Sequence, residues 1–313
     1  MAFILPDEAK DCLRTTFGEA PIENVAPMSG GLSASYLVSF DVAGHGYVLR
    51  KGDLLRAPNE AKCMQIASDR AVAPKLRAAD PERALFVMDR ITSAPPTRDA
   101  GWIARVTTAL RRLHEGPAFP RGDKLIDLLG RVDGALRSRD REPVPRVVFE
   151  AVDEVSPLLA PWAESAPCHN DLNPTNIVDT GAEVRFVDWE TACAGDPFVD
   201  LAGLALFAFV EEAPRAALLE AYLGRTPNEE ERARAILSRA IALSFYSAAF
   251  TFVASFGPPE KAEARTIADL FALLGKGTRP SPATMAASFA SELAASRKTD
   301  EFAAAKATLT THR

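Results

Sequence analysis

The sequence is poor in the features that mark secreted, metal-stabilised or membrane proteins. Its 313 residues include only four cysteines, which are widely spaced and lack the paired spacing of a metal site: Cys12, Cys63, Cys168 and Cys193. Such cysteines are typical of reduced, mostly buried thiols. We therefore expect no disulfide framework and predict a cytoplasmic location.

Long apolar runs and a surplus of positive charge are also missing. The longest apolar run, 201–210, has about ten residues, which is half the length that a membrane-spanning helix requires. The first residues have neither the basic lead nor the long apolar core of a secretory signal. A formal net charge of −6 argues against a broad nucleic-acid-binding surface. We predict neither a membrane nor a nucleic acid as a partner, and the sequence leaves the oligomeric state open.

The apolar content of 47% is sufficient for more than one sizeable core. Residues 22–91 have the pattern of strands interrupted by one helix, and helical patterns dominate over 98–275. After residue 278, Pro280 and Pro282 interrupt an Ala- and Ser-rich stretch that is either one or two loosely docked helices or partly disordered. We predict an amino-terminal lobe over 1–92, a larger helical lobe over 93–278 and a tail over 279–313.

The most informative stretch combines an acid, an amide and a second acid. It runs from His169 to Asn176 and continues, after a short gap, with Phe186-Val187-Asp188-Trp189-Glu190. An aspartate five residues before an asparagine, with another acid at the end of the next strand, is the spacing of a kinase-like catalytic loop. In such a loop Asp171 aligns the attacking hydroxyl and accepts its proton. Asn176 and Asp188 offer the hard oxygen ligands that Mg²⁺ prefers.

The residues between these groups predict a β-hairpin. Residues 177–178 and 184–187 have the composition of short strands, and the segment 179–182 between them is typical of a turn. Such a hairpin places the metal-binding candidates, which flank it, side by side at one end. Taken alone, the polar cluster could be a simple turn. We expect His169 to brace the loop rather than to carry a proton.

The amino-terminal region supplies candidates for phosphate binding. Gly30, Gly31 and Ser33 form a turn motif whose backbone N–H groups could cradle a phosphate, although an ordinary hairpin turn is the commoner explanation. A later strand, 47–51, ends in Arg50 and Lys51. Because neighbouring side chains on a strand point to opposite faces, only one of these two cations can reach a nucleotide.

These motifs resemble those of the choline/ethanolamine kinase and aminoglycoside phosphotransferase superfamily, which includes bacterial choline-kinase-like and thiamine-kinase-like members. The similar segments are Cys168-His169-Asn170-Asp171-Leu172, Val187-Asp188-Trp189-Glu190-Thr191-Ala192 and Gly195-Asp196-Pro197-Phe198-Val199-Asp200-Leu201-Ala202. The resemblance extends with gaps roughly over 20–250. It implies an α+β, protein-kinase-like fold of two lobes. The small lobe would be an antiparallel sheet with one main helix, and the larger lobe would be mostly helical and carry the catalytic β-hairpin.

The resemblance also implies roles for the residues of the catalytic segment. Asp171 is the catalytic base, and Asn176 and Asp188 bind the metal. Asp200 braces the catalytic loop from the start of a helix. ATP and Mg²⁺ are the implied cofactors.

In the amino-terminal lobe, the family pattern favours Arg50 as the phosphate-binding cation and leaves Lys51 in solvent. It pairs Arg50 with Glu60, an acid that could otherwise only mark the start of a helix. The segment Met88-Asp89-Arg90-Ile91 corresponds to the hinge whose backbone holds adenine. Candidates for nucleotide binding there are Met88, Asp89 and Ile91.

The acceptor is expected to be a small alcohol. After Asp188 the sequence has Trp189-Glu190 instead of Phe-Gly, no Ala-Pro-Glu follows, and the distance to Asp200 is too short for a peptide-docking loop. Trp189 and Glu190 are candidates for contacting a choline- or ethanolamine-like acceptor, because a quaternary ammonium binds to aromatic rings and acids.

Several alternatives stay open. The helix after Asp200 lacks the acid found in eukaryotic choline kinases, so an aminoglycoside or other antibiotic, thiamine and sugars are further candidate acceptors. The non-enzymatic alternative is a catalytically silent, nucleotide-binding protein that acts through partners.

Overall fold

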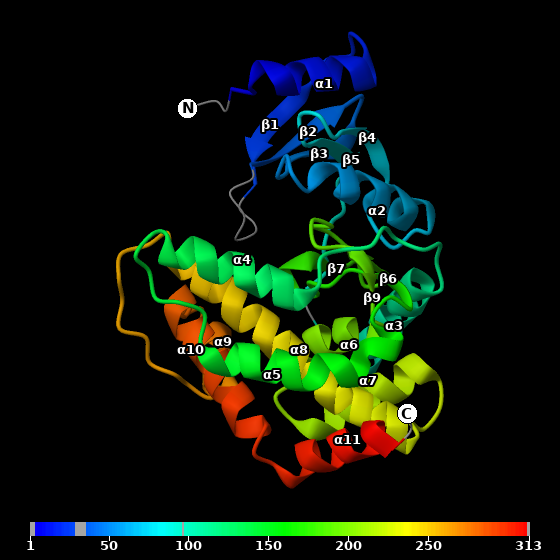
Figure 1. Ribbon diagram of the computed structural model, residues 1–313. Coiled ribbons are helices and arrows are strands. Elements are labelled where there is room, and N and C mark those ends of the chain that lie inside the picture. The colour runs from blue at the N-terminus through cyan, green and yellow to red at the C-terminus, as the bar shows by residue number, and fades with distance from the viewer. Residues whose placement is uncertain (1–3, 29–35, 96, 312–313) are drawn as a thin grey trace. The chain divides into compact units, whose positions relative to one another are not determined.

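The computed structural model describes residues 4–28, 36–95 and 97–311 (Figure 1). The chain divides into two compact units. Unit 1 comprises Met1–Arg121 and Ala166–Ala194, and unit 2 comprises Gly122–Ser165 and Gly195–Arg313. This division differs from the predicted lobes, because the candidate catalytic segment groups with the amino-terminal sheet. The lobe boundaries at 92 and 278 therefore stay a prediction.

Unit 1 is built on an antiparallel five-stranded sheet with the strand order β1-β2-β3-β5-β4. The strands are β1 (Glu23–Pro27), β2 (Leu37–Val42), β3 (His45–Lys51), β4 (Leu76–Asp80) and β5 (Leu85–Asp89). Val38, Phe40 and Val42 on β2 are buried, because alternate side chains share one face of a strand. They form one core with Leu49 and Val87 of the neighbouring strands.

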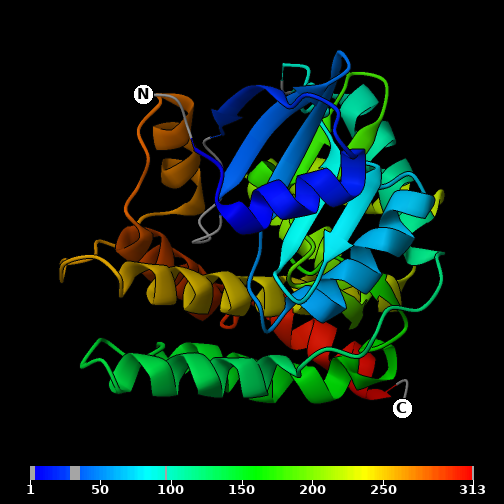
Figure 2. The same ribbon diagram turned by 90° about the horizontal axis from the view of Figure 1, so that it is seen from above.

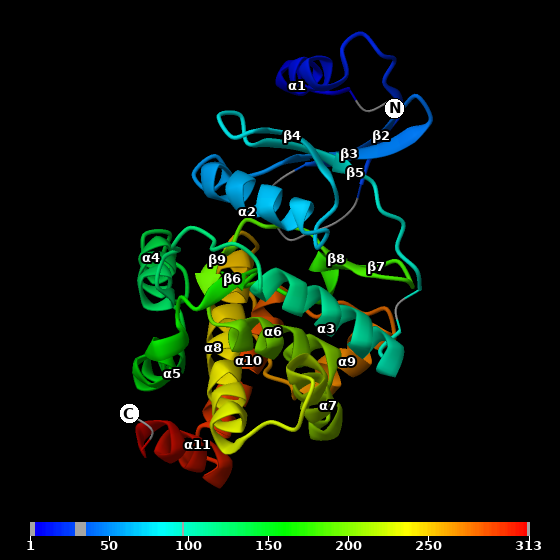
Figure 3. The same cartoon turned by 90° about the vertical axis from the view of Figure 1, so that its right-hand side faces the viewer.

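The helices of unit 1 are α1 (Asp7–Phe17), α2 (Ala57–Asp69) and α3 (Ala100–His114). Helix α1 lies across the strands in Figure 2, and Figure 3 shows α1 and α2 on opposite faces of the sheet. The segment before α2 is held by Asp53, whose carboxylate accepts a hydrogen bond of 2.8 Å from the backbone N–H of Leu55. Pro58 in the first turn of α2 is harmless, because the N–H that it lacks has no partner inside the helix.

The candidate catalytic segment forms two small sheets. Strand β6 (Ala166–Cys168) pairs with β9 (Cys193–Gly195), and β7 (Ile177–Asp179) pairs with β8 (Val184–Phe186). The second pair is antiparallel, with Ile177 opposite Phe186, which confirms the predicted hairpin. A backbone hydrogen bond of 2.7 Å from the N–H of Phe186 to the carbonyl of Val72 ties this hairpin to the connection between α2 and β4.

Unit 2 is helical over the residues that the structure describes. Its helices are α4 (Leu125–Arg137), α5 (Arg146–Leu159), η1 (Ala160–Trp162), α6 (Pro197–Ala208), α7 (Glu212–Leu223), α8 (Glu229–Ala254), α9 (Ile267–Gly275), α10 (Pro282–Ser296) and α11 (Asp300–Thr311). Helix α8 is central and packs against α5, α6, α10 and α11. The carboxy-terminal helices bury Phe289, Leu293 and Phe302 in this core. The antiparallel sheet and the helical second unit confirm the predicted α+β class.

Helix α8 corrects the expectation that no segment is long enough to cross a membrane. Its 26 residues pass the criterion of length and apolar composition, as does no other described helix. The core helix of a soluble protein passes the same test, and half of the most apolar window of α8 is buried inside the protein. The helix starts with a capping box formed by Asn228 and Glu231. Its buried residues, among them Leu237, Leu243 and Tyr246, belong to the core of unit 2.

Candidate functional site

The loop after β6 joins the first two candidate residues by hydrogen bonds. The side-chain amide of Asn176 donates to the carboxylate Oδ2 of Asp171 at 3.1 Å and to the backbone carbonyl of Asp171 at 2.9 Å. The amide of Asn173 donates to the other carboxylate oxygen, Oδ1, at 3.0 Å. Asn173 also accepts a hydrogen bond of 2.9 Å from the N–H of Thr175, which starts the 3-10 turn η2 (Pro174–Asn176). The turn thus folds the loop back, and the carboxylate of Asp171 is oriented by two amides.

Asp188 lies at the same end of the hairpin as Asn176. The N–H of Val187 donates to the backbone carbonyl of Asn176 at 3.0 Å. Asp188 therefore directly follows the last hydrogen bond between the two arms of the hairpin. Asp188 has a φ of 65° and Asn170 a φ of 63°, in the left-handed region that short polar residues tolerate better than most others. Asn176 thus contacts Asp171 directly and Asp188 follows the residue whose backbone is bonded to Asn176; the roles of the three side chains stay a prediction.

Arg50 at the end of β3 faces an excess of acid. Its guanidinium forms an ion pair with Glu60 of α2, donates to Oδ1 of Asp188 at 2.5 Å and lies 3.7 Å from Oε2 of Glu190. Arg50 is 7% exposed and Glu60 is 1% exposed. The pairing of Arg50 with Glu60, which the family resemblance implied, is present. Three carboxylates thus share one buried guanidinium.

This excess of acid is visible in the pKa values of the cluster. Burial raises the pKa of Glu60 to about 7, although the positive charge of Arg50 acts in the opposite direction. Burial and the neighbouring charge of Asp188 also raise the pKa of Glu190. Burial disfavours the charged form of Arg50, but the attraction of Asp188 and Glu60 outweighs it, so its pKa rises. The cluster therefore has more negative than positive charge, which favours an additional cation.

Two residues of α2 and its entry contact this segment without having been expected from the sequence. The Nη1 atom of Arg56 lies 3.5 Å from Oε1 of Glu190. The side-chain amide of Asn59 donates to the backbone carbonyl of Ala192 at 2.7 Å. Neither contact follows from hydrophobic periodicity or local spacing. Both residues are polar, and Asn59 directly precedes Glu60, whereas Arg56 lies four positions before it.

Lys51 differs from its expected place in solvent. Its ammonium donates to Oε1 of Glu8 on α1 at 2.8 Å and to the backbone carbonyl of Arg83 at 2.7 Å. Only 22% of its side chain is exposed. It points to the opposite face from Arg50, as strand geometry requires, but that face is partly covered by α1.

His169 and Trp189 lie behind the loop. The ring nitrogen Nε2 of His169 is 2.9 Å from the backbone carbonyl of Val187, and its ring lies 4.7 Å from the ring of Trp189. The indole N–H of Trp189 donates to the backbone carbonyl of Phe186 at 3.1 Å, and this side chain is fully buried. The expected contact of Trp189 with an acceptor therefore has no exposed ring surface to support it. Glu190 keeps a partly exposed carboxylate.

The hinge candidates differ in whether their backbone N–H groups are already hydrogen-bonded within the protein. The N–H of Asp89 donates to the carbonyl of Lys75 at 2.9 Å, and the N–H of Arg90 donates to Gly46 at 3.0 Å. Among the described residues, the N–H of Ile91 has no hydrogen-bond acceptor. Met88 is buried within β5, and the carboxylate of Asp89 is bound by Arg77. Ile91 is thus the hinge residue with a backbone donor to offer.

Gly30, Gly31 and Ser33 lie outside the described residues. Asp200 belongs to unit 2, where it lies in the first turn of α6 after the N-cap residue Asp196. Its expected role in bracing the catalytic loop stays a prediction.

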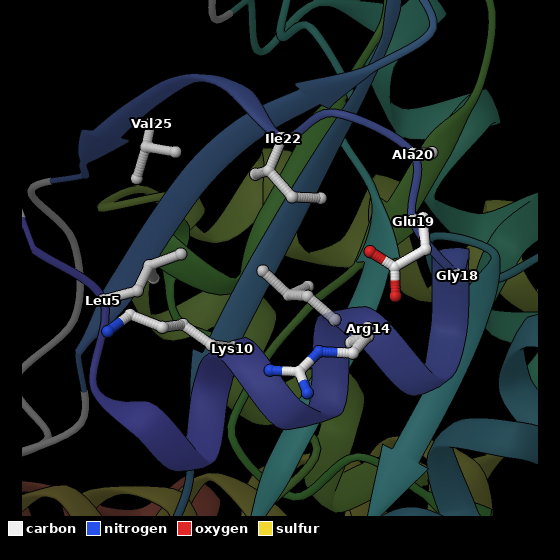
Figure 4. A pocket seen from close by; sticks show the side chains of 9 residues that line it. Leu5, Lys10, Arg14, Gly18, Glu19, Ala20, Ile22 and Val25 are labelled. Carbon is white, nitrogen blue, oxygen red and sulfur yellow. The ribbon is translucent and has the colours of Figure 1, made fainter.

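A pocket lies between α1 and β1 (Figure 4). Leu5, Ile22 and Val25 point toward it in Figure 4, and Arg14 and Glu19 lie at one end. No residue that was predicted to bind a ligand lines it. We do not assign it to the site.

Comparisons with known proteins identify the family of the chain. The profile of the Phosphotransferase enzyme family matches residues 24–236. A LicA homolog of Mycoplasma capricolum is 24% identical over 151 residues, which cover 45% of this chain and 57% of that protein. The chain thus spans little more than half the length of this curated relative.

Solved structures show the same fold. A choline/ethanolamine kinase family protein from Mesorhizobium loti has a TM-score of 0.70 at 22% identity, and the match covers 97% of this chain and 99% of the other. LicA in complex with AMP has a TM-score of 0.65 at 16% identity, with 91% of this chain and 96% of the other covered. At such low identities the likeness concerns the fold, and it confirms the predicted kinase-like architecture.

Proposed function

Because the chain belongs to the phosphotransferase enzyme family, we propose that it transfers the terminal phosphoryl group of ATP to the hydroxyl of a small molecule. The observation that carries this proposal is the arrangement of three oxygen-bearing side chains. The side chain of Asn176 is hydrogen-bonded to that of Asp171. Asp188 directly follows Val187, whose backbone N–H is hydrogen-bonded to the carbonyl of Asn176. Phosphoryl transfer depends on positioning and on charge compensation more than on covalent chemistry, and this arrangement supplies both.

In this proposal Asp171 is the catalytic base. Its two carboxylate oxygens accept hydrogen bonds from Asn173 and Asn176, which fix the plane of the carboxylate. An acceptor hydroxyl that donates to this carboxylate is held in one direction and can release its proton to it during transfer. His169 supports the loop from behind, through its contact with the carbonyl of Val187.

The residues present fit a magnesium ion. Asn176 has an amide oxygen and Asp188 a carboxylate, the hard donors that suit this ion. Among the described residues, Oδ2 of Asp188 has no hydrogen-bond donor, and the surrounding acids exceed the cations. When bound, Mg²⁺ neutralises phosphate charge. The protein's own contribution is to hold the two ligands at the end of one hairpin.

We propose that the nucleotide is bound by unit 1. Arg50 would contact phosphate, with Glu60 fixing its guanidinium. The free N–H of Ile91 would bind adenine, in a hinge that also contains Met88 and Asp89. Gly30, Gly31 and Ser33 stay candidates for the phosphate turn. The AMP complex of the structurally similar LicA supports nucleotide binding by this fold.

The acceptor that we favour is a choline- or ethanolamine-like alcohol, because the Mesorhizobium loti protein that matches nearly the whole chain is a choline/ethanolamine kinase family protein. Glu190 would supply negative charge near such an acceptor. Its partly exposed carboxylate and the net negative charge of the cluster suit a cationic molecule.

A nucleotide-consumption screen tests the proposal. Purified protein with MgATP is offered a panel of amino alcohols, thiamine, sugars and aminoglycosides, and the product is identified by its added phosphate. We expect consumption with a choline- or ethanolamine-like alcohol. Asp171→Asn should bind MgATP and fold normally but lose about 10²–10⁴-fold in turnover. MgATP binding without turnover on any alcohol would favour the non-enzymatic alternative, and unchanged turnover in Asp171→Asn would exclude this base.

A further inference from the structure

The backbone carbonyl of Ala192 receives two donors from helix α2. The side-chain amide of Asn59 donates to it at 2.7 Å and the thiol of Cys63, one turn later, lies 3.4 Å away. Ala192 is 1% exposed and Cys63 is fully buried. A buried carbonyl with two partners on one helix fixes the position of that helix along its axis, because both bonds would break if the helix moved by a fraction of a turn.

The turn that contains Ala192 is held on its other side by the catalytic loop. The hydroxyl of Thr191 donates to the backbone carbonyl of His169 at 2.9 Å, and the amide of Asn170 donates to the carbonyl of Thr191 at 3.2 Å. The N–H of Ala192 itself donates to the carbonyl of Trp189 at 3.1 Å. The turn therefore connects α2 with the residues directly before Asp171.

Helix α2 is thus joined to the catalytic segment at two points of different chemistry. One is the charged bridge in which Arg50 binds both Glu60 and Asp188. The other is the neutral bond of Asn59, the residue before Glu60. A nucleotide that engages Arg50 competes for the charged bridge, whereas it leaves the neutral bond unchanged. The neutral bond can therefore keep Glu60 in register with Arg50 when the charges rearrange.

We infer that Asn59 is a positioning residue for nucleotide binding, acting through Glu60 and Arg50. The inference rests on the proposed function, since it assumes that Arg50 binds the phosphates of MgATP. It requires no contact between Asn59 and any ligand. What Asn59 contributes is the placement of α2 against the turn at Ala192.

The test compares MgATP binding by titration calorimetry in the full-length protein and its variants. Asn59→Ala removes the amide donor and should weaken MgATP binding roughly five- to tenfold, the equivalent of one hydrogen bond. The melting temperature should change little, because alanine favours helix α2. The matched control is Gln65→Ala on the same helix, whose amide donates to the exposed carboxylate of Asp69 at 3.0 Å. It should bind MgATP as the wild type does.

A double-mutant cycle separates positioning from general damage. In a Glu60→Gln background, Asn59→Ala should weaken MgATP binding less than twofold further, because the group through which it acts is already altered. Equal factors in both backgrounds, or unchanged binding in Asn59→Ala beside a wild type that binds MgATP, would overturn the inference alone. A wild-type protein that does not bind MgATP would overturn the proposed function and the inference with it.

Discussion

Two buried arginines of this protein have surroundings that differ in charge balance. Arg50 in unit 1 is shared by three carboxylates, which leaves negative charge in excess. Arg234 in unit 2 forms an ion pair with one carboxylate, that of Asp196, at 2.6 Å. Both guanidiniums are almost fully shielded from solvent. The two arginines therefore differ in the number of carboxylates around them and not in burial.

Two aromatic rings flank the guanidinium of Arg234. Its guanidinium lies 4.2 Å from the ring centroid of Trp162 and 4.0 Å from that of Phe198. Asp196 also caps α6, because its carboxylate accepts a hydrogen bond of 2.9 Å from the N–H of Phe198. The pair of Arg234 and Asp196 has one positive and one negative charge, and its ion pair joins Nη2 to Oδ1.

The two arginine clusters show how a ligand-binding site differs from an ion pair that only stabilises the fold. In a balanced buried pair, removing one member leaves the charge of the other uncompensated, which is strongly destabilising. A cluster with excess acid instead carries unfavourable repulsion, which a bound cation relieves. We expect substitutions in the first to affect folding and substitutions in the second to affect ligand binding and turnover.

The largest effect is expected for Asp188→Asn. Removing this carboxylate should lower turnover about a thousandfold, since it withdraws a charge placed for the transferred group. The melting temperature should stay the same or rise, because repulsion with Glu60 and Glu190 decreases. Turnover and thermal unfolding of the same preparation measure both quantities.

The control for this variant lies at the other end of the same hairpin. Asp179 is bound by Arg105 at 2.6 Å, so Asp179→Asn should keep near-wild-type turnover and lose some stability. If Asp188→Asn instead lost stability while turning over normally, the two arginine clusters would not differ in the way described.

Arg234→Ala should show the opposite response. The variant leaves Asp196 buried without its cation, which should lower the free energy of unfolding by about 3 kcal/mol. Denaturant titration measures this loss. Arg232→Ala, an exposed arginine two residues earlier on α8, should change the same quantity by about 0.5 kcal/mol or less. Equal stabilities of the two variants would contradict a structural role for Arg234.

Apart from the pairing of Arg50 with Glu60, which the family resemblance implied, the contacts predicted from the sequence are those with a local signature. The hairpin between Asn176 and Asp188 followed from strand composition and a turn motif, and the exclusion of Lys51 from the face of Arg50 followed from strand alternation. The unexpected contacts join residues far apart in the chain. Asn59 and Ala192 are 133 positions apart and Arg234 and Asp196 are 38 apart.

Such polar contacts produce no periodic pattern of residues in the sequence. Many residue types can supply a single donor, and every residue has a backbone carbonyl. The family pattern identified Glu60, one position away from Asn59, but carried no information about its neighbour. Trp189 shows another limit of the sequence, since an aromatic ring suits both an acceptor wall and a core, and its side chain is fully buried.

The acid cluster should also give stability a pH dependence. Burial raises the pKa of Glu60 from 4.5 to about 7, so the folded protein holds this proton more tightly than the unfolded chain does. The free energy of unfolding should therefore fall as pH rises from about 4.5 to about 7, by about 2 kcal/mol. Denaturant titrations across this range measure the slope.

Glu60→Gln should remove most of that slope. A smaller part should persist, because burial also raises the pKa of Glu190. If the free energy of unfolding of the wild type instead increased with pH over this interval, burial would not disfavour the charged form of Glu60.

The smallest effect is expected for Lys51, the direct neighbour of Arg50 on β3. Lys51→Met breaks the ion pair with Glu8, a contact near the surface, and should lower the free energy of unfolding by about 0.5 kcal/mol. MgATP binding should stay within about twofold of wild type, whereas Arg50→Met should weaken it by far more than tenfold. Calorimetric titration of both variants compares two cations that differ by one position and by one face of the sheet. If Lys51→Met weakened MgATP binding as much as Arg50→Met, strand alternation would not decide which cation reaches the phosphates, and the acid cluster around Arg50 would need another explanation.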